Sequence, residues 1–386
     1  MAAEKICRSW IALLHFSAIF EKGFFTKSSF GDGNDMDRLM EWFGDGKYQK
    51  NLDRILRFWR GEERFMISIN SEMHNYRQKY DDSIILEMAP SNLKAHASLP
   101  GVNLPAFIAD FGTVSTGRYW GGSTRFDSTG SNLFIDPVAD SVESALFIEP
   151  LAVEDPSMDA ARAIRLYRGL SEKLETKSLW MRTPDMQGVL NTAAFILDQK
   201  ELFVSFYDQP DLTHHLLGKI CHFLIAYAKY LRRMTSDKIC GNIWPYVFFP
   251  SELGFGITED MMPLLSADLY EEYGIPYLKS MADALGGLVI HCCGEWGRHV
   301  PALKKSGLPI KAMEFHYPFT LIEELEPLVD KVVWIPYISL EKQKIFSSEV
   351  DYYRHLLKNT SEAHRYWFAF PSETEEAVGF AREFGS

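Results

Sequence analysis

A histidine and a cysteine two positions apart are the residues of this chain best suited to chemistry. His291-Cys292-Cys293-Gly294 directly follows the apolar run 285–290, which is typical of a buried β-strand. Successive side chains of a strand point to opposite faces, so we expect His291 and Cys293 to share one face and Cys292 to point away. Imidazole nitrogen and thiolate sulfur are both zinc ligands. The alternative is a strand that ends in two buried cysteines, since free cysteine is among the most buried residue types.

Strand-like apolar runs alternate with longer helical patterns from Asn51 onwards, and this alternation implies a parallel sheet. The number of units, about eight, favours a closed (β/α)8 TIM barrel in the α/β class over an open doubly wound sheet. The predicted strands are 65–69, 106–109, 178–181, 243–247, 288–291, 312–315, 332–335 and 366–370. The predicted helices include 51–59, 159–173, 210–232, 266–285, 297–306, 320–328 and 348–357.

The first fifty residues differ in character from the rest of the chain. Residues 1–50 contain glycine- and aspartate-rich turns around a short helical piece, which predicts an N-terminal helical extension ahead of a barrel domain over 51–386. The apolar stretch 10–20 faintly imitates a signal peptide, but it has no small-x-small cleavage site and is too short to span a bilayer. We therefore predict an amphipathic or buried helix there, and no membrane partner.

Barrel enzymes carry their chemistry at the carboxyl ends of the strands, and this rule selects a possible third ligand. Glu314 and His316 lie where the chain leaves the predicted strand 312–315, the next strand after the one that ends at His291. Because consecutive barrel strands are neighbours, His291, Cys293 and Glu314 are predicted to converge on a zinc ion. Water, substrate or His316 would take the fourth position. The alternative is that Glu314 pairs with a lysine or arginine of the barrel.

Other polar and aromatic residues follow predicted strands or lie near the zinc ligands in sequence. Asp185 and Gln187 are expected either to bind substrate or to order the mouth of the barrel. His316 is expected to contact substrate, with support of the site or capping of its loop as the alternatives. Trp296 is a candidate substrate wall, and so are Tyr119 and Trp120, whose alternative is simple packing in a loop. Three further acidic residues are expected to be solvated rather than catalytic: Glu252, Glu259 and Asp260.

Composition restricts the classes of partner and the compartment. The 386 residues carry a net charge of −12, which argues against nucleic acid because that affinity depends on neutralising phosphates with lysine and arginine. Hydrophobic residues make up 46% of the chain, enough for one large core. Five cysteines are an odd number in a long chain, so no disulfide framework is predicted and a reducing cytoplasm is expected.

Several segments resemble the uroporphyrinogen decarboxylase superfamily, and specifically its zinc- and corrinoid-linked methyltransferase branch. The resemblance extends from Asn51 to the C-terminus and is carried by residues 257–278 and 289–294, with support from 107–112, 183–190 and 206–211. It implies a (β/α)8 barrel, a zinc ion and a corrinoid carried by a partner protein. In related zinc methyltransferases of the methionine synthase type, a glutamate follows the His-x-Cys pair by about one βα unit, which is where Glu314 falls.

Two departures from the family pattern shape the functional hypothesis. The region around 65–72 lacks the arginines with which a true decarboxylase would hold porphyrinogen carboxylates. The chain also has no cysteine after Cys293, where the methyltransferase branch carries a third thiol. The resemblance therefore implies transfer of a methyl group from an O- or N-methylated small molecule to a corrinoid protein, as in demethylase systems. The oligomeric state stays open, with a homodimer among the options.

Two alternatives remain beside the methyltransferase hypothesis. One is a metal-free decarboxylase of the uroporphyrinogen decarboxylase type, for which Arg118 and Arg182 are the candidate carboxylate-binding residues. The other is a non-catalytic barrel that binds a corrinoid or tetrapyrrole.

Overall fold

The structure is a computed structural model that describes residues 46–70, 80–109, 111–128, 133–240 and 247–384. The predicted extension lies outside these residues except for 46–50, and so does most of the predicted strand 243–247. The largest unit is a six-stranded sheet in which every neighbouring pair is parallel. Its order is β1 (Phe65–Ile69), β11 (Arg365–Phe370), β10 (Val333–Ile338), β9 (Ile310–Tyr317), β8 (Leu288–His291) and β7 (Phe255–Thr258).

A second parallel sheet and a hairpin complete the described strands. The second sheet has the order β2 (Ala106–Ile108), β5 (Trp180–Arg182) and β6 (Ile239–Cys240), and the antiparallel hairpin pairs β3 (Thr124–Phe126) with β4 (Leu133–Ile135). A parallel bridge between Gln187 and Thr258 connects the chain that follows β5 to the end of β7. The described residues thus form a mixed α/β fold, and closure into a full (β/α)8 barrel stays a prediction.

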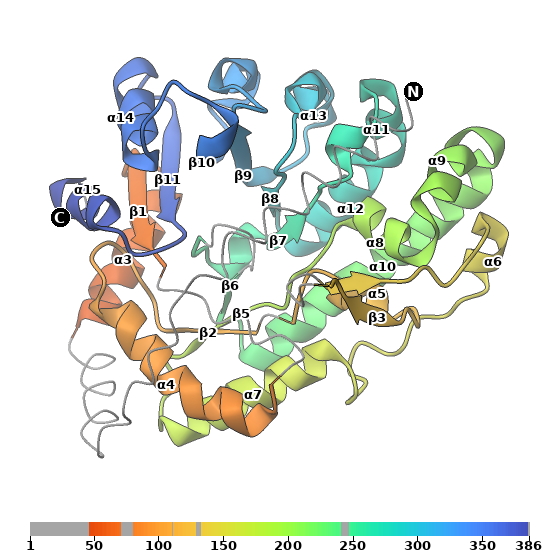
Figure 1. The fold of residues 1–386 in the computed structure, drawn as a ribbon, viewed down its shortest axis with the longest axis horizontal. Helices are drawn as coiled ribbons and strands as arrows, with labels where there is room; N and C mark the ends of the chain where they lie inside the picture. The colour runs from red at the N-terminus through yellow and green to blue at the C-terminus, as the bar shows by residue number, and fades with distance from the viewer. Residues whose placement is uncertain (1–45, 71–79, 110, 129–132, 241–246, 385–386) are drawn as a thin grey trace.

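The helices lie outside the strands, with α11, α13 and α14 at the top of the view and α4 and α7 at the bottom (Figure 1). The α-helices are α3 (Lys47–Trp59), α4 (Asp82–Ser98), α5 (Ser115–Arg118), α6 (Val142–Leu146), α7 (Asp159–Lys173), α8 (Val189–Ile196), α9 (Gln199–Asp208), α10 (Pro210–Thr235), α11 (Ala267–Tyr273), α12 (Ile275–Leu285), α13 (Val300–Ser306), α14 (Glu349–Asn359) and α15 (Glu375–Phe384). The short 3₁₀ helices are η2 (Ser251–Leu253), η3 (Met262–Leu264), η4 (Gly297–His299), η5 (Ile322–Leu328) and η6 (Leu340–Lys342). None of the helices within the described ranges has the length and apolar character needed to cross a bilayer.

One predicted helix, 266–285, is two helices in the structure. Ser266 caps α11 by accepting a hydrogen bond from the backbone N–H of Leu269 at 3.2 Å. The chain then breaks at Gly274, and α12 begins with Ile275 and Pro276. Proline has no N–H to donate and its ring would clash inside a continuing helix, so it fits the first turn of a new one.

Alternation along the strands separates the two faces of the large sheet. Val289 on β8 and Ala312 on β9 belong to a compact cluster of buried residues, whereas their neighbours Ile290 and Met313 pack into a larger cluster beneath the helices. Side chains two positions apart share a face, so His291 and Glu314 point towards the same side as the compact cluster. The pattern of the strands therefore brings these two polar residues together at one edge of the sheet.

Candidate metal centre

Three neighbouring strands end in side chains that could hold a metal ion. Asp260 follows β7, His291 ends β8 and Cys293 lies two residues further on, and ligand atoms of these three residues all lie within 4.8 Å of one another. A second group within the same limit joins His291 to Glu314 and His316 of β9. His291 is common to both groups. The predicted residues His291, Cys293 and Glu314 are thus brought to one place, but the structure divides them between two groups.

Glu314 is held between two imidazoles. Its side chain is fully buried, with one oxygen in contact with Nδ1 of His291 and the other 2.5 Å from Nε2 of His316. Burial alone would raise the pKa of Glu314, but the positive charges of the two histidines outweigh it and hold that pKa below its usual value. The partners of Glu314 are therefore histidines rather than the lysine or arginine considered from the sequence.

His291 has a carboxylate near each ring nitrogen. Nδ1 contacts Glu314, and Nε2 lies 3.7 Å from Oδ1 of Asp260. Burial lowers the pKa of His291, but the negative charges of Glu314 and Asp260 more than compensate, and the pKa rises well above its ordinary value. A positive charge is thus strongly favoured at this position, and a metal ion bound at Nε2 would supply one without the added proton.

Asp260 corrects the expectation of a solvated acidic loop. Its side chain is 30% exposed, but Oδ1 accepts hydrogen bonds from the thiol of Cys293 at 3.2 Å and from the backbone N–H of Cys293 at 3.3 Å. The strand before it, β7, is not among the strands predicted from the sequence, so the sequence alone does not place Asp260 at a strand end. With Phe255–Thr258 recognised as a strand, the location of chemistry at the carboxyl ends of barrel strands selects Asp260.

The two adjacent cysteines differ as the alternation of a strand predicts. Cys292 is fully buried and packs into the large hydrophobic cluster, whereas Cys293 is partly exposed beside Asp260. Burial, followed by repulsion from Asp260, raises the pKa of the Cys293 thiol. A divalent cation bound at Cys293 would reverse this effect, because coordination deprotonates a thiol.

Glu259, the second residue of the supposedly solvated loop, is buried. Its side chain is 1% exposed, and burial together with repulsion from Asp260 raises its pKa to about 8. The carboxylate lies against Gly188 so closely that a Cβ added there would stand 1.5 Å from Oε1 of Glu259. The glycine at 188 is therefore required by the side chain that precedes Asp260. Glu252, the third member of that loop, is exposed as expected.

Gln187 and Asp185 belong to a hydrogen-bond relay that ends beside Asp260. The amide of Gln187 donates to Asp185, and Asn191 donates from Nδ2 to Oε1 of Gln187 at 2.6 Å. Oδ1 of Asn191 then accepts the backbone N–H of Met261 at 2.9 Å. The relay fixes the residue after Asp260, which agrees with the expectation that these residues order the mouth. Contact with substrate stays a prediction for Asp185 and Gln187.

The three predicted aromatic walls are packed in the core. Trp296 is fully buried, with its ring centroid 6.4 Å from that of Trp334. Tyr119 and Trp120 pack on Phe223 of α10, with ring centroids 5.1 and 5.7 Å from it. These contacts match the packing alternative for 119 and 120, and a role in substrate binding stays a prediction for all three.

Comparison with known proteins identifies the fold. No family model and no curated protein sequence matches the chain. Among solved structures, it is similar to a methyltransferase from Methanosarcina mazei, with a TM-score of 0.60, 13% identity, and coverage of 86% of this chain and 98% of that one. A structure described as a vitamin-B12 independent methionine synthase from Listeria monocytogenes has a TM-score of 0.41 at 10% identity, covering 79% and 87%. At 13% identity, the first similarity establishes that this chain shares the fold of the Methanosarcina mazei methyltransferase.

Proposed function

We propose that the chain is a zinc-dependent methyltransferase that moves a methyl group from an O- or N-methylated small molecule to a corrinoid carried by a partner protein. The observation that carries the proposal is the meeting of Asp260, His291 and Cys293 at the ends of two adjacent strands. The shared fold with a methyltransferase supports the reaction class. The proposal includes closure of the strands over residues 51–386 into a (β/α)8 barrel.

The donor atoms fit zinc in number and type. Zinc accepts imidazole nitrogen, thiolate sulfur and carboxylate oxygen, and catalytic sites typically combine three such ligands with one open position. In our assignment the ligands are Nε2 of His291, Sγ of Cys293 and an oxygen of Asp260. Glu314 holds the other ring nitrogen of His291, an arrangement that orients a metal-binding histidine and strengthens it as a ligand. The assignment predicted from the sequence, in which Glu314 itself binds zinc, is the alternative.

The chain's residues orient the site rather than supply a nucleophile. Glu314, anchored by His316, keeps the ring of His291 in place, and the relay through Asn191 fixes the loop of Asp260. When bound, zinc would act as a Lewis acid on the oxygen or nitrogen that loses the methyl group. A reduced corrinoid on the partner would supply the nucleophile for the methyl group, so no side chain of this protein would need to attack it. His316 and Asp185 are the residues that we propose to face the substrate.

The arginines that a decarboxylase would need are already engaged. Arg118 forms an ion pair with the buried Asp159. Arg182 is fully buried, with its guanidinium 4.3 Å from the ring centroid of Phe248. Neither arginine is presented as a fork for substrate carboxylates, so these contacts favour methyl transfer over the decarboxylase alternative.

Zinc analysis of the purified protein, combined with a demethylation screen using reduced cobalamin as acceptor, tests the proposal. We expect about one zinc ion per chain, because the three proposed ligands form one site. Asp260→Asn should lower zinc content sharply, while Glu314→Gln should retain zinc with weaker affinity. The reverse order would assign Glu314 as the ligand instead of Asp260. Full activity in a metal-free preparation would contradict the proposed function.

A further inference from the structure

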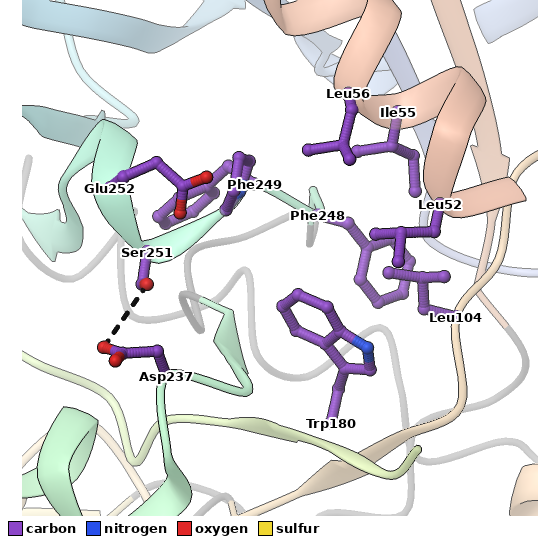
Figure 2. A pocket seen from close by; sticks show the side chains of 11 residues that line it. Leu52, Ile55, Leu56, Leu104, Trp180, Asp237, Phe248, Phe249, Ser251 and Glu252 are labelled. Carbon is purple, nitrogen blue, oxygen red and sulfur yellow. Dashed lines mark hydrogen bonds between the residues drawn. The ribbon is translucent and has the colours of Figure 1, made fainter. Parts of the chain in front are cut away.

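A cavity lies at the opposite ends of the strands from the metal centre. It has a volume of about 220 Å³ and is bordered by α3, the first residue of β5 and the segment 248–252 that leads into β7 (Figure 2). Asp260 and Cys293 follow β7 and β8, whereas Trp180 begins β5 and Glu252 precedes β7. Glu252 and Asp260 therefore lie at opposite ends of β7, with the cavity at the first end and the metal centre at the second. A molecule in this cavity is therefore not the substrate of the metal centre.

Most of the cavity wall is apolar. Figure 2 shows aliphatic side chains of α3 on one side, with the ring of Phe248 next to Leu52, and the rings of Trp180 and Phe249 across from them. The aliphatic members are Leu52, Ile55, Leu56 and Leu104. Such walls favour a ligand with a hydrocarbon body, and the aromatic faces also attract positive charge.

The polar side chains that line the cavity offer a ligand hydrogen-bond acceptors rather than donors. The indole N–H of Trp180 already donates to the hydroxyl of Tyr48 at 3.0 Å, and the hydroxyl of Ser251 donates to Asp237 at 3.4 Å. Asp237 and Glu252 lie at the end of the cavity away from α3 (Figure 2). Each carboxylate can accept several hydrogen bonds, so capacity remains after Ser251 is counted.

The charged residues that line the cavity are both acidic. Its eleven lining residues include two carboxylates and no lysine, arginine or histidine. Two guanidinium groups lie behind the wall: Arg232 donates to the carbonyl oxygens of Ser251 and Gly254, and Arg182 lies 4.3 Å from the ring centroid of Phe248. Neither arginine lines the cavity, so the charged groups that a ligand would meet first are the two carboxylates, which attract cations.

We propose that this cavity binds a small organic cation, an amine with an aromatic or aliphatic body. The hydrocarbon part would pack between the aliphatic side chains of α3 and the rings of Trp180 and Phe249. The ammonium group would donate charge-assisted hydrogen bonds to Asp237 and Glu252. The proposal is independent of methyl transfer, because it rests on residues at the other end of the strands.

Calorimetric titration of the full-length, zinc-loaded protein with 2-phenylethylammonium tests the proposal. Two matched probes have the same aromatic body: 3-phenylpropionate is anionic and 2-phenylethanol is neutral. We expect the ammonium to bind with a Kd of about 1 mM or lower and both controls to bind at least about tenfold more weakly. The double variant Asp237→Asn/Glu252→Gln should remove this preference, whereas Glu87→Gln/Asp283→Asn, which loses two exposed carboxylates outside the cavity, should preserve it.

A variant that fills the cavity gives an independent check. Leu56→Trp changes a half-buried position of α3 that faces the cavity, and it should weaken binding of the ammonium about tenfold or more by occupying its space. Zinc content should be unchanged in every cavity variant, which separates this result from any failure of the metal centre. Equal affinity for the alcohol and the ammonium, no ammonium binding up to about 10 mM, or unchanged binding in Leu56→Trp would overturn the proposal.

Discussion

The carboxylates at the two ends of the parallel strands differ in how far they are exposed to water. At the end with the metal centre, the carboxylates of Glu259, directly after β7, and of Glu314, in the second half of β9, are buried, with 1% and 0% of each residue exposed. Before β6 and β7, the carboxylates of Asp237 and Glu252 are exposed beside a cavity whose other walls are apolar. One end therefore buries two of its carboxylates, while the other leaves the carboxylates of Asp237 and Glu252 in contact with water.

This difference indicates which end carries chemistry. Burying an ionised group costs several kcal/mol unless partners compensate, so such groups persist where their interactions are needed. At the buried end, Glu314 gains two histidine partners and Asp260 gains the thiol of Cys293. At the exposed end, water solvates the carboxylates and a ligand has only to displace it. The first arrangement suits a tightly held metal ion and the second a reversible small ligand.

The largest expected effect is the loss of the thiol ligand. Cys293→Ser replaces a soft sulfur donor by a hydroxyl that binds zinc poorly, so zinc content should fall below stoichiometric and methyl transfer should drop on the order of 10²-fold or more. Cys292→Ala is the matched control, because its side chain packs into the core on the other face of the strand. Metal analysis and the cobalamin assay check both variants. Equal zinc loss in the two would place the effect in folding rather than in ligation.

The sequence predicted the site only where it predicted the strand that carries each residue. β8 was predicted with its observed bounds, because Leu288-Val-Ile290 is a continuous apolar run that a buried parallel strand requires. β7 was missed, because Phe255-Gly-Ile-Thr258 contains a glycine and is short, and glycine is disfavoured in strands. Because β7 was missed, Asp260 was missed as a candidate ligand, since its position at a strand end is recognised only when that strand is known.

The relations between side chains were harder to predict than the strands. The order of the strands predicts that Glu314 lies beside His291, and it does. That Glu314 contacts Nδ1 of His291, instead of pointing to the place where His291 and Cys293 could share a metal ion, depends on side-chain geometry. Burial of Glu259 depends on the absence of a side chain at Gly188, more than 70 residues earlier in the sequence. Local patterns carry no information about such long-range contacts.

The second-largest effect is expected from a methyl group at position 188, which would disturb the buried carboxylate of Glu259. In Gly188→Ala the new Cβ would meet Oε1 of Glu259 at 1.5 Å, and the buried carboxylate has little space into which to move. We expect a loss of about 1–3 kcal/mol in the free energy of unfolding, measured by denaturant titration, together with weaker zinc binding. The double variant Gly188→Ala/Glu259→Ala should recover much of the stability, because the clash is removed. Additive losses in the double variant would show that Glu259 is not the obstacle.

The relay through Asn191 should have a smaller effect that is specific to the metal. Asn191→Ala leaves the backbone N–H of Met261 without its partner, which costs about 1–3 kcal/mol for a buried group and loosens the loop of Asp260. Zinc affinity should fall about tenfold, as it does when an outer-shell partner of a metal site is removed. Gln187→Met is the matched control, since it removes the acceptor of the Asn191 amide and leaves the contact between Asn191 and Met261 in place. Competition with a chelator measures the affinities, and identical losses in both variants would contradict the proposed role of the Met261 contact.

The smallest expected effect comes from a further acid near the carboxyl ends of the strands. Glu349, the first residue of α14 after β10, is half-buried, and burial followed by repulsion from Glu376 raises its pKa from 4.5 to about 7. The folded protein therefore holds this proton more tightly than the unfolded chain does. Stability is highest below pH 4.5 as far as this group is concerned, falls as pH rises from 4.5 to 7, and stays lower above pH 7.

Glu349→Gln removes this penalty, so the variant should unfold at higher denaturant concentration than the parent above pH 7, by about 1–2 kcal/mol. The gain should vanish below pH 4.5, where the parent glutamate is protonated in both states. Glu376→Gln removes only the lesser cause and should give a smaller gain over the same range. Unfolding titrations at several pH values distinguish these curves. A Glu349→Gln gain that is equal at pH 4 and pH 8 would mean that packing, not charge, limits stability at this end of the strands, and the contrast in charge between the two ends would lose one of its supports.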